Sequence, residues 1–134
     1  MDIRLCHQRQ LILACLDDFT PNSTLQDYVG GQFGNDTHLW RSAVIDFIYQ
    51  NMKRDLIMVL PCQQQYSEKN CNEIKELLLN GDRDNGIELL VVWNILYFQG
   101  TEKLKKITNH FCLDNWNSLY VELNEDLLNA INNI

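Results

Sequence analysis

The sequence predicts a mainly α-helical single domain, folded as a bundle of about five or six helices with a short strand or hairpin near 56–60 and 119–123. Two apolar segments, 39–60 and 87–99, carry the clearest core patterning. A chain of 134 residues suits one domain, here taken as residues 1–134. Its hydrophobic content of 46% is normal for a globular protein and argues against disorder.

The first helix is expected in the N-terminal twenty residues, with the polar run 7–10 facing water. It should stop at Pro21, because the residue before a proline disfavours helical geometry. Three glycines within residues 30–34 then indicate a tight or flexible connection. The apolar stripe of this helix consists of Leu5, Ile12, Cys15, Leu16 and Phe19.

The clearest helix begins near Asp36 or Thr37, since either side chain can accept hydrogen bonds from the free amides of a helix start. Its apolar residues recur at the spacing of one helical face, and its polar residues lie mostly opposite. The apolar face is formed by Trp40, Ala43, Val44, Phe47 and Ile48, and the polar face by Arg41, Asp46, Gln50 and Lys53.

Two apolar segments are ambiguous between helix and strand. The run 56–60, closed by Pro61, fits a buried strand or a last helical turn. Residues 87–99 lie between Gly86 and Gly100, and their length favours a helix buried on most sides. Two adjacent β-branched valines in that segment favour a strand, so the prediction depends mainly on length.

The remaining helices are predicted from caps and periodicity. Ser67 should cap a helix that ends at Gly81, whose conformational freedom suits a helix terminus. Thr101 should cap a helix through Phe111, and Asn124 should cap the closing helix. Between these two helices, residues 119–123 alternate briefly between apolar and polar, as in a strand.

Composition and charge exclude several classes of function. Eleven basic and eighteen acidic side chains give a net charge of -7, which repels phosphate backbones and argues against direct nucleic-acid binding. No apolar run is long enough to span a bilayer, so no membrane association is expected. The N-terminal ten residues do not resemble a secretory signal, and a cytoplasmic protein is expected.

No spacing of chemical groups indicates catalysis, a metal site or a cofactor. The five cysteines form no Cys-x-x-Cys pair, and reduced thiols are expected. The acidic segment 80–86 fits the ligand positions of a calcium-binding EF-hand in neither register, and it is interpreted as a turn between helices. The three histidines have no nucleophile at a suitable spacing. A binding protein without enzymatic activity, metal or cofactor is therefore predicted.

The sequence LWRSAVIDFI at 39–48, the run 56–60 and the apolar segment between Gly86 and Gly100 together resemble small bacterial immunity proteins. Such proteins accompany contact-dependent growth-inhibition toxins and related polymorphic toxins. The resemblance covers roughly residues 36–107 and consists of a tryptophan-led helix, small size and acidic charge. It implies a cytosolic protein, monomeric or weakly dimeric, that neutralises one cognate toxin C-terminal domain, often a nuclease.

The candidate partner contacts are acidic residues near expected loops. Negative charge would attract the cationic nucleic-acid-cleaving site of a nuclease toxin. These candidates are Asp17, Asp18, Asp27, Asp36, Asp82, Asp84 and Glu88. An acidic secretion chaperone that holds an effector segment is the alternative. An alternating strand pattern, which only residues 119–123 supply, and an exposed apolar groove would favour it. A small enzyme would require Cys and His to converge in a pocket.

Overall fold

The computed structural model describes all residues, 1–134, and confirms a mainly helical single domain. Seven α-helices and one two-stranded antiparallel sheet are present, together with four short 3-10 helices. No helix has the length and apolar character that crossing a membrane requires. The α-helices are α1 (Ile3–Leu16), α2 (Thr37–Lys53), α3 (Gln64–Ser67), α4 (Cys71–Asn80), α5 (Leu89–Ile95), α6 (Glu102–His110) and α7 (Glu125–Asn132). The strands are β1 (Ile57–Val59) and β2 (Phe98–Gly100), and the 3-10 helices are η1 (Pro21–Ser23), η2 (Gly31–Phe33), η3 (Arg83–Asn85) and η4 (Trp116–Tyr120).

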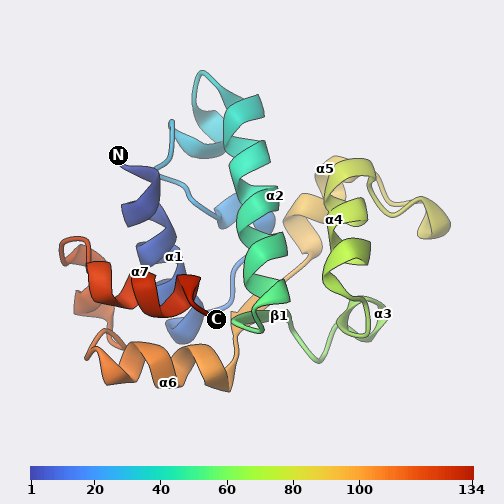
Figure 1. Ribbon diagram of the computed structural model, residues 1–134. Coiled ribbons are helices and arrows are strands. Elements are labelled where there is room, and N and C mark those ends of the chain that lie inside the picture. Colours follow the sequence, from blue (N-terminus) through green and yellow to red (C-terminus); the bar gives the residue numbers. More distant parts are fainter.

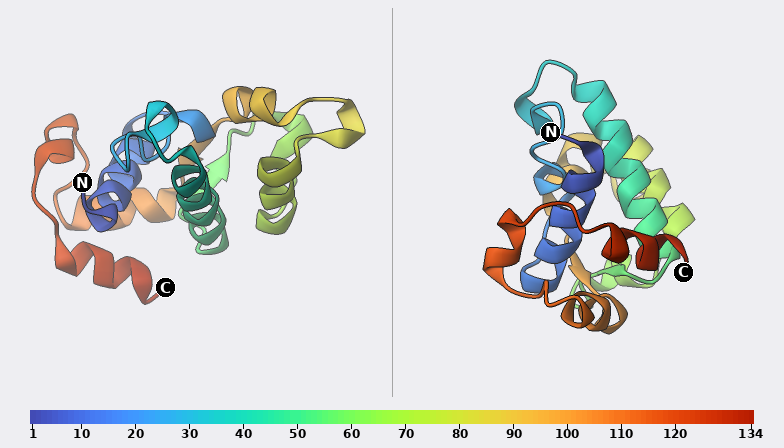
Figure 2. Two further views of the ribbon diagram at one scale, coloured as in Figure 1. Left: turned by 90° about the horizontal axis from the view of Figure 1, so that it is seen from above. Right: turned by 60° about the vertical axis from the view of Figure 1, so that its left-hand side comes forward.

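Helix α2 lies between two groups of helices (Figure 1). On one side α1 packs with α6 and η4, and α7 packs on α6. On the other side α4 packs against α2, and α5 packs against α4. A view from above shows the same division, with α1, α6 and α7 at one end and the α4–α5 connection at the other (Figure 2).

In the N-terminal half of the chain, the predicted start and apolar face of α2 are confirmed, whereas the predicted polar face of α1 is wrong. Asp36 caps α2 by accepting a hydrogen bond from the amide of Leu39 at 3.1 Å, as expected. The first helix ends at Leu16, ahead of the predicted stop. The prediction that residues 7–10 face water was wrong, because Gln8 and Gln10 are buried. Both side chains hydrogen-bond to backbone groups of distant segments, which the periodicity of one helix does not reveal.

The two ambiguous segments meet in the small sheet. Residues 56–60 contain β1, which pairs with β2 so that Met58 lies opposite Gln99. The segment 87–99 is therefore not one helix: α5 ends at Ile95, and the chain continues extended into β2. At Gly100 a Cβ atom would lie 2.8 Å from the carbonyl oxygen of Ala14. This close approach of two backbones requires glycine and brings β2 against α1.

The structure tests four further predictions in the second half of the chain. Thr101 and Asn124 cap α6 and α7, as expected. The cap of α4 is Asn70 rather than Ser67, and it forms a reciprocal capping box with Glu73. The predicted strand at 119–123 was wrong, because residues in and before it form η4, capped by Asn115.

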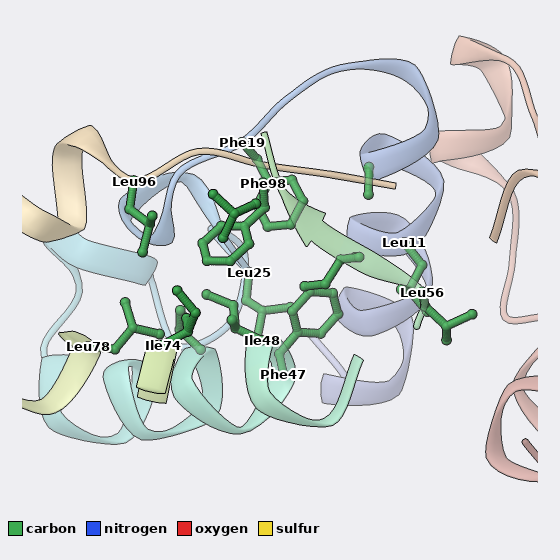
Figure 3. Packing of buried hydrophobic residues seen from close by; sticks show 14 of the residues in the cluster. Leu11, Phe19, Leu25, Phe47, Ile48, Leu56, Ile74, Leu78, Leu96 and Phe98 are labelled. Atoms are coloured by element: carbon green, nitrogen blue, oxygen red, sulfur yellow. The ribbon is translucent and has the colours of Figure 1, made fainter. Parts of the chain in front are cut away.

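One hydrophobic core connects both groups of helices. Figure 3 shows side chains from α1, α2, α4 and the strands converging on a common interior, including Leu11, Phe47, Ile74 and Phe98. Trp40 and Trp93 are buried with ring centroids 5.6 Å apart, and their indole N–H groups donate to backbone carbonyls. The core therefore joins α2 to α5 as well as to α1, and it includes Leu25, which anchors the loop that precedes α2.

Candidate functional site

The structure does not gather the seven predicted acidic contacts into one patch. Asp17 and Asp18 follow α1, whereas Asp84 and Glu88 lie in the α4–α5 connection at the far end of the molecule (Figures 1 and 2). Six of the seven are exposed, and Asp82 is buried. The six exposed residues are Asp17, Asp18, Asp27, Asp36, Asp84 and Glu88.

The assignment of Asp82 as an exposed contact is corrected by its surroundings. Its carboxylate accepts hydrogen bonds from the Tyr66 hydroxyl and from the Asn85 side-chain amide, each at 2.8 Å. The side-chain bond from Asn85, and then that from Tyr66, stabilise the charged form and hold the pKa of Asp82 below its ordinary value. Backbone hydrogen bonds with Ile87 close the same turn. Asp82 thus organises the 82–87 turn and is not available to a partner.

Asp27 and Asp36 stand at the two ends of a compact loop that forms one tip of the molecule, beside the N-terminal end of α2 (Figure 1). We define the loop surface by Asp27, Val29, Phe33 and Asp36. Phe33 is 90% exposed and Val29 is 37% exposed, and both carboxylates are exposed as well. Because aromatic side chains are enriched at interface centres, this exposed ring, flanked in the sequence by two exposed acids, makes the loop surface a candidate protein contact.

The backbone of this loop is strained. Leu25 and Val29 have positive φ values of 51° and 46°. A β-branched residue rarely adopts this region, and each such residue costs on the order of 1–3 kcal/mol. Gly34 permits a further close approach, because a Cβ atom there would lie 2.0 Å from the Val29 carbonyl oxygen. Strain of this kind persists only where the surrounding structure enforces it.

Buried hydrogen bonds fix the base of the loop. The Gln10 side-chain oxygen accepts from the Leu25 amide at 3.0 Å, and the Trp40 indole donates to the Thr24 carbonyl at 2.9 Å. The Leu25 side chain is itself only 2% exposed. The loop is therefore held rigidly at one end while Val29 and Phe33 remain in solvent. A pre-organised surface of this kind loses little conformational entropy when a partner binds.

A hollow of about 200 Å³ lies beside the loop, between α1, residues 23–27 and η4. Asp27 lines it and approaches the Arg9 guanidinium at 3.9 Å. The Cys6 thiol also lines it, and burial, followed by the charge of Asp27, raises the pKa of that thiol. Tyr120, which is 81% exposed, stands at its edge. This hollow can receive a side chain of a protein that contacts the loop surface.

The histidine and cysteine side chains form no hydrogen bond with one another. No cluster of three or more His, Cys, Asp or Glu residues is placed to hold a metal ion. The half-buried His7 ring packs edge-on against Phe47, and burial lowers its pKa. The Cys15 sulfur lies 3.5 Å from the Thr108 hydroxyl, and burial raises the pKa of that thiol. All five cysteines are free, with Cys62 and Cys112 exposed.

Comparison with protein-family models, with curated proteins and with solved structures yields no match to this chain.

Proposed function

We propose that this chain is a small immunity protein that binds and neutralises one cognate bacterial toxin domain through its loop surface. The observation that carries the proposal is Phe33, which is 90% exposed on a strained loop anchored in the core and is flanked in the sequence by two exposed acids. Truncation of such a central aromatic anchor commonly weakens a protein complex by 2 kcal/mol or more.

Charge supports a toxin with a cationic contact surface. The chain carries a net charge of -7, and Asp27 and Asp36, which flank Phe33 in the sequence, are both exposed. A nuclease presents positive charge where it binds phosphates, so opposite potentials would accelerate the encounter. The immunity protein would act by covering that surface and would need no catalytic group of its own. We place this action in the cytoplasm, with the chain as a monomer or weak dimer.

The alternative of a secretion chaperone loses its supporting feature. Of the two features that would favour it, the alternating strand at 119–123 is replaced by the 3-10 helix η4. The loop surface is also short and rigidly held, whereas a chaperone needs an extended groove for an unfolded segment. The immunity function is therefore preferred.

The test mixes this chain with the C-terminal toxin domain encoded beside its gene and measures binding by calorimetry. We expect a complex whose dissociation constant rises at least tenfold in Phe33→Ala. The matched control is Tyr97→Ala, which removes an aromatic ring that is 40% exposed and lies outside the loop surface. Unchanged affinity in Phe33→Ala would exclude the loop surface, and absence of any complex would exclude the immunity function.

A further inference from the structure

A second hollow, which we call the groove, has a volume of about 400 Å³ and lies between α2, α4 and α5. Its volume falls within the range of small-molecule sites, which is roughly 300–1,000 Å³. Half of its lining is apolar, and the rest includes several charged side chains. The apolar residues are Ile45, Leu78, Leu79, Leu89 and Trp93.

The net charge of the residues that line this groove is opposite in sign to the net charge of the whole chain. Acidic side chains outnumber basic ones in the sequence, yet Arg41, Lys75 and His38 line the groove with Asp46 as the one carboxylate. Neither Arg41 nor Lys75 takes part in any of the three ion pairs of the structure. With His38 neutral, Arg41 and Lys75 against Asp46 give the groove a formal charge of +1 in a protein of net charge -7.

Arg41 is held in place but lacks a hydrogen-bond acceptor. Its guanidinium carbon lies 5.6 Å from the centre of the Trp93 ring, in a cation–π contact. Its Nε atom is buried without any partner. A guanidinium presents five N–H donors in a planar fork that matches a carboxylate, and burial strengthens such a pair. No nitrogen of the Arg41 side chain has a hydrogen-bond partner, and a carboxylate in the groove would supply an acceptor for the terminal N–H groups, which are not closed off as Nε is.

The walls around Arg41 are rigid. The Trp93 indole N–H donates to the Leu78 carbonyl at 2.9 Å, and the ring also contacts the buried Trp40. Lys75 is positioned by Tyr49, with its Nζ atom 4.9 Å from the ring centre. Arg41 therefore lies against an aromatic ring that the fold fixes, and Lys75 lies over a second ring, that of Tyr49.

We propose that this groove binds a small monocarboxylic acid with an apolar body, whose carboxylate pairs with Arg41 and Lys75. The apolar body lies against Trp93 and Leu89, where its burial adds to the affinity. A dianion such as inorganic phosphate is disfavoured, because its second charge would meet Asp46 and its surface has no apolar part.

The test titrates 4-phenylbutyrate into the native protein and follows amide and indole N–H signals by NMR. The expected dissociation constant is roughly millimolar for a ligand of this size. The Trp93 indole signal should shift, and the indole of Trp116, which is 55% exposed and outside the groove, should not. The neutral amide of the same acid should bind at least tenfold more weakly, and inorganic phosphate should cause no saturable shift.

Arg41→Gln should weaken 4-phenylbutyrate at least tenfold, whereas the control Lys106→Gln removes an exposed charge of α6 and should change nothing. Lys75→Gln gives a second measurement if Arg41→Gln does not fold. Equal affinity for the acid and its amide, or a shift of Trp116 without Trp93, would overturn the proposal. Neither result depends on the toxin.

Discussion

At the scale of single residues, the most informative side chain is Asp82, because it shows that an acidic residue in a polar turn can be structural. Its carboxylate accepts one hydrogen bond from the Tyr66 hydroxyl, in α3, and one from the Asn85 side-chain amide, in the same turn. Burial and the hydrogen bond to Asp82 raise the pKa of the Tyr66 hydroxyl, which keeps that group a donor. The pair ties α3 to the connection that follows α4.

We predict that Asp82→Asn lowers the free energy of unfolding at pH 7 by about 1–2 kcal/mol, since a charged acceptor of two hydrogen bonds is lost. The folded pKa of Asp82 lies below its unfolded value of about 3.9, so its stabilisation is complete above that value. It is lost as the pH falls through the folded pKa. The difference between the native chain and the variant should therefore shrink in urea titrations below about pH 4.

The control is Asp84→Asn, which removes an exposed carboxylate from the same turn and should change stability by less than about 0.5 kcal/mol. A difference between Asp82→Asn and the native chain that stays constant down to pH 2 would contradict the role given to the Asp82 carboxylate.

At the scale of elements, helix α7 depends on a side chain from α1 for its attachment. Gln8 is fully buried, donates to the Glu122 carbonyl at 2.9 Å and accepts from the Asn124 amide at 2.7 Å. Asn124 is the residue that caps α7. One amide side chain therefore positions the start of the last helix against the first, across nearly the whole length of the chain.

Gln8→Ala should destabilise the protein by about 2–3 kcal/mol, because two backbone groups lose their partners and a cavity forms. Hydrogen exchange measured by mass spectrometry should accelerate most in residues 122–132. Gln50→Ala, at an exposed position of α2, serves as the control and should leave exchange unchanged. Uniform acceleration over the whole chain would refute the specific attachment of α7.

The sequence predicts those elements that local rules determine. Asp36, Thr101 and Asn124 are caps recognisable from a few neighbouring residues, and the apolar face of α2 follows its own period. The burial of Gln8 and the break between α5 and β2 depend on residues far away in the chain, so no window of sequence contains them. At β2 the chain adopts an extended conformation because it pairs with β1, and Gly100 lets its backbone lie close to the backbone of α1.

The candidate site is predicted only in part for the same reason. Charge alone indicates Asp27 and Asp36, and both are exposed. Phe33 was missed, because its exposure follows from the conformation of a strained loop rather than from its residue type. Its position between Gly31 and Gly34 is the one signal in the sequence that could have drawn attention to it.

At the scale of the whole molecule, ion pairs compensate only a small part of the excess negative charge. Eighteen acidic side chains are opposed by eleven basic ones, and the structure contains three ion pairs: Arg4–Glu125, Arg9–Asp27 and Glu102–Lys105. Each of these pairs has at least one substantially exposed partner, so each contributes little. We therefore expect repulsion among the remaining acids to outweigh the attraction within the pairs.

Raising the NaCl concentration from about 10 mM to about 200 mM should raise the melting temperature by roughly 2–5 °C, since the screening length falls from about 30 Å to below 10 Å. Calorimetry in a buffer of constant pH measures this directly. Sodium sulfate is avoided, because sulfate also strengthens apolar burial. A fall in melting temperature with NaCl would mean that attraction dominates the electrostatics of the fold.

The free cysteines have a consequence for handling the protein in air. Cys62 follows β1 and Cys112 follows α6, and both are exposed on the same chain. A molecule with one accessible sulfur can join only one other molecule, and oxidation then stops at a pair. Two accessible sulfurs let each copy link to two others, so oxidation produces chains of increasing length, and a reductant is needed to keep single copies in a stored sample.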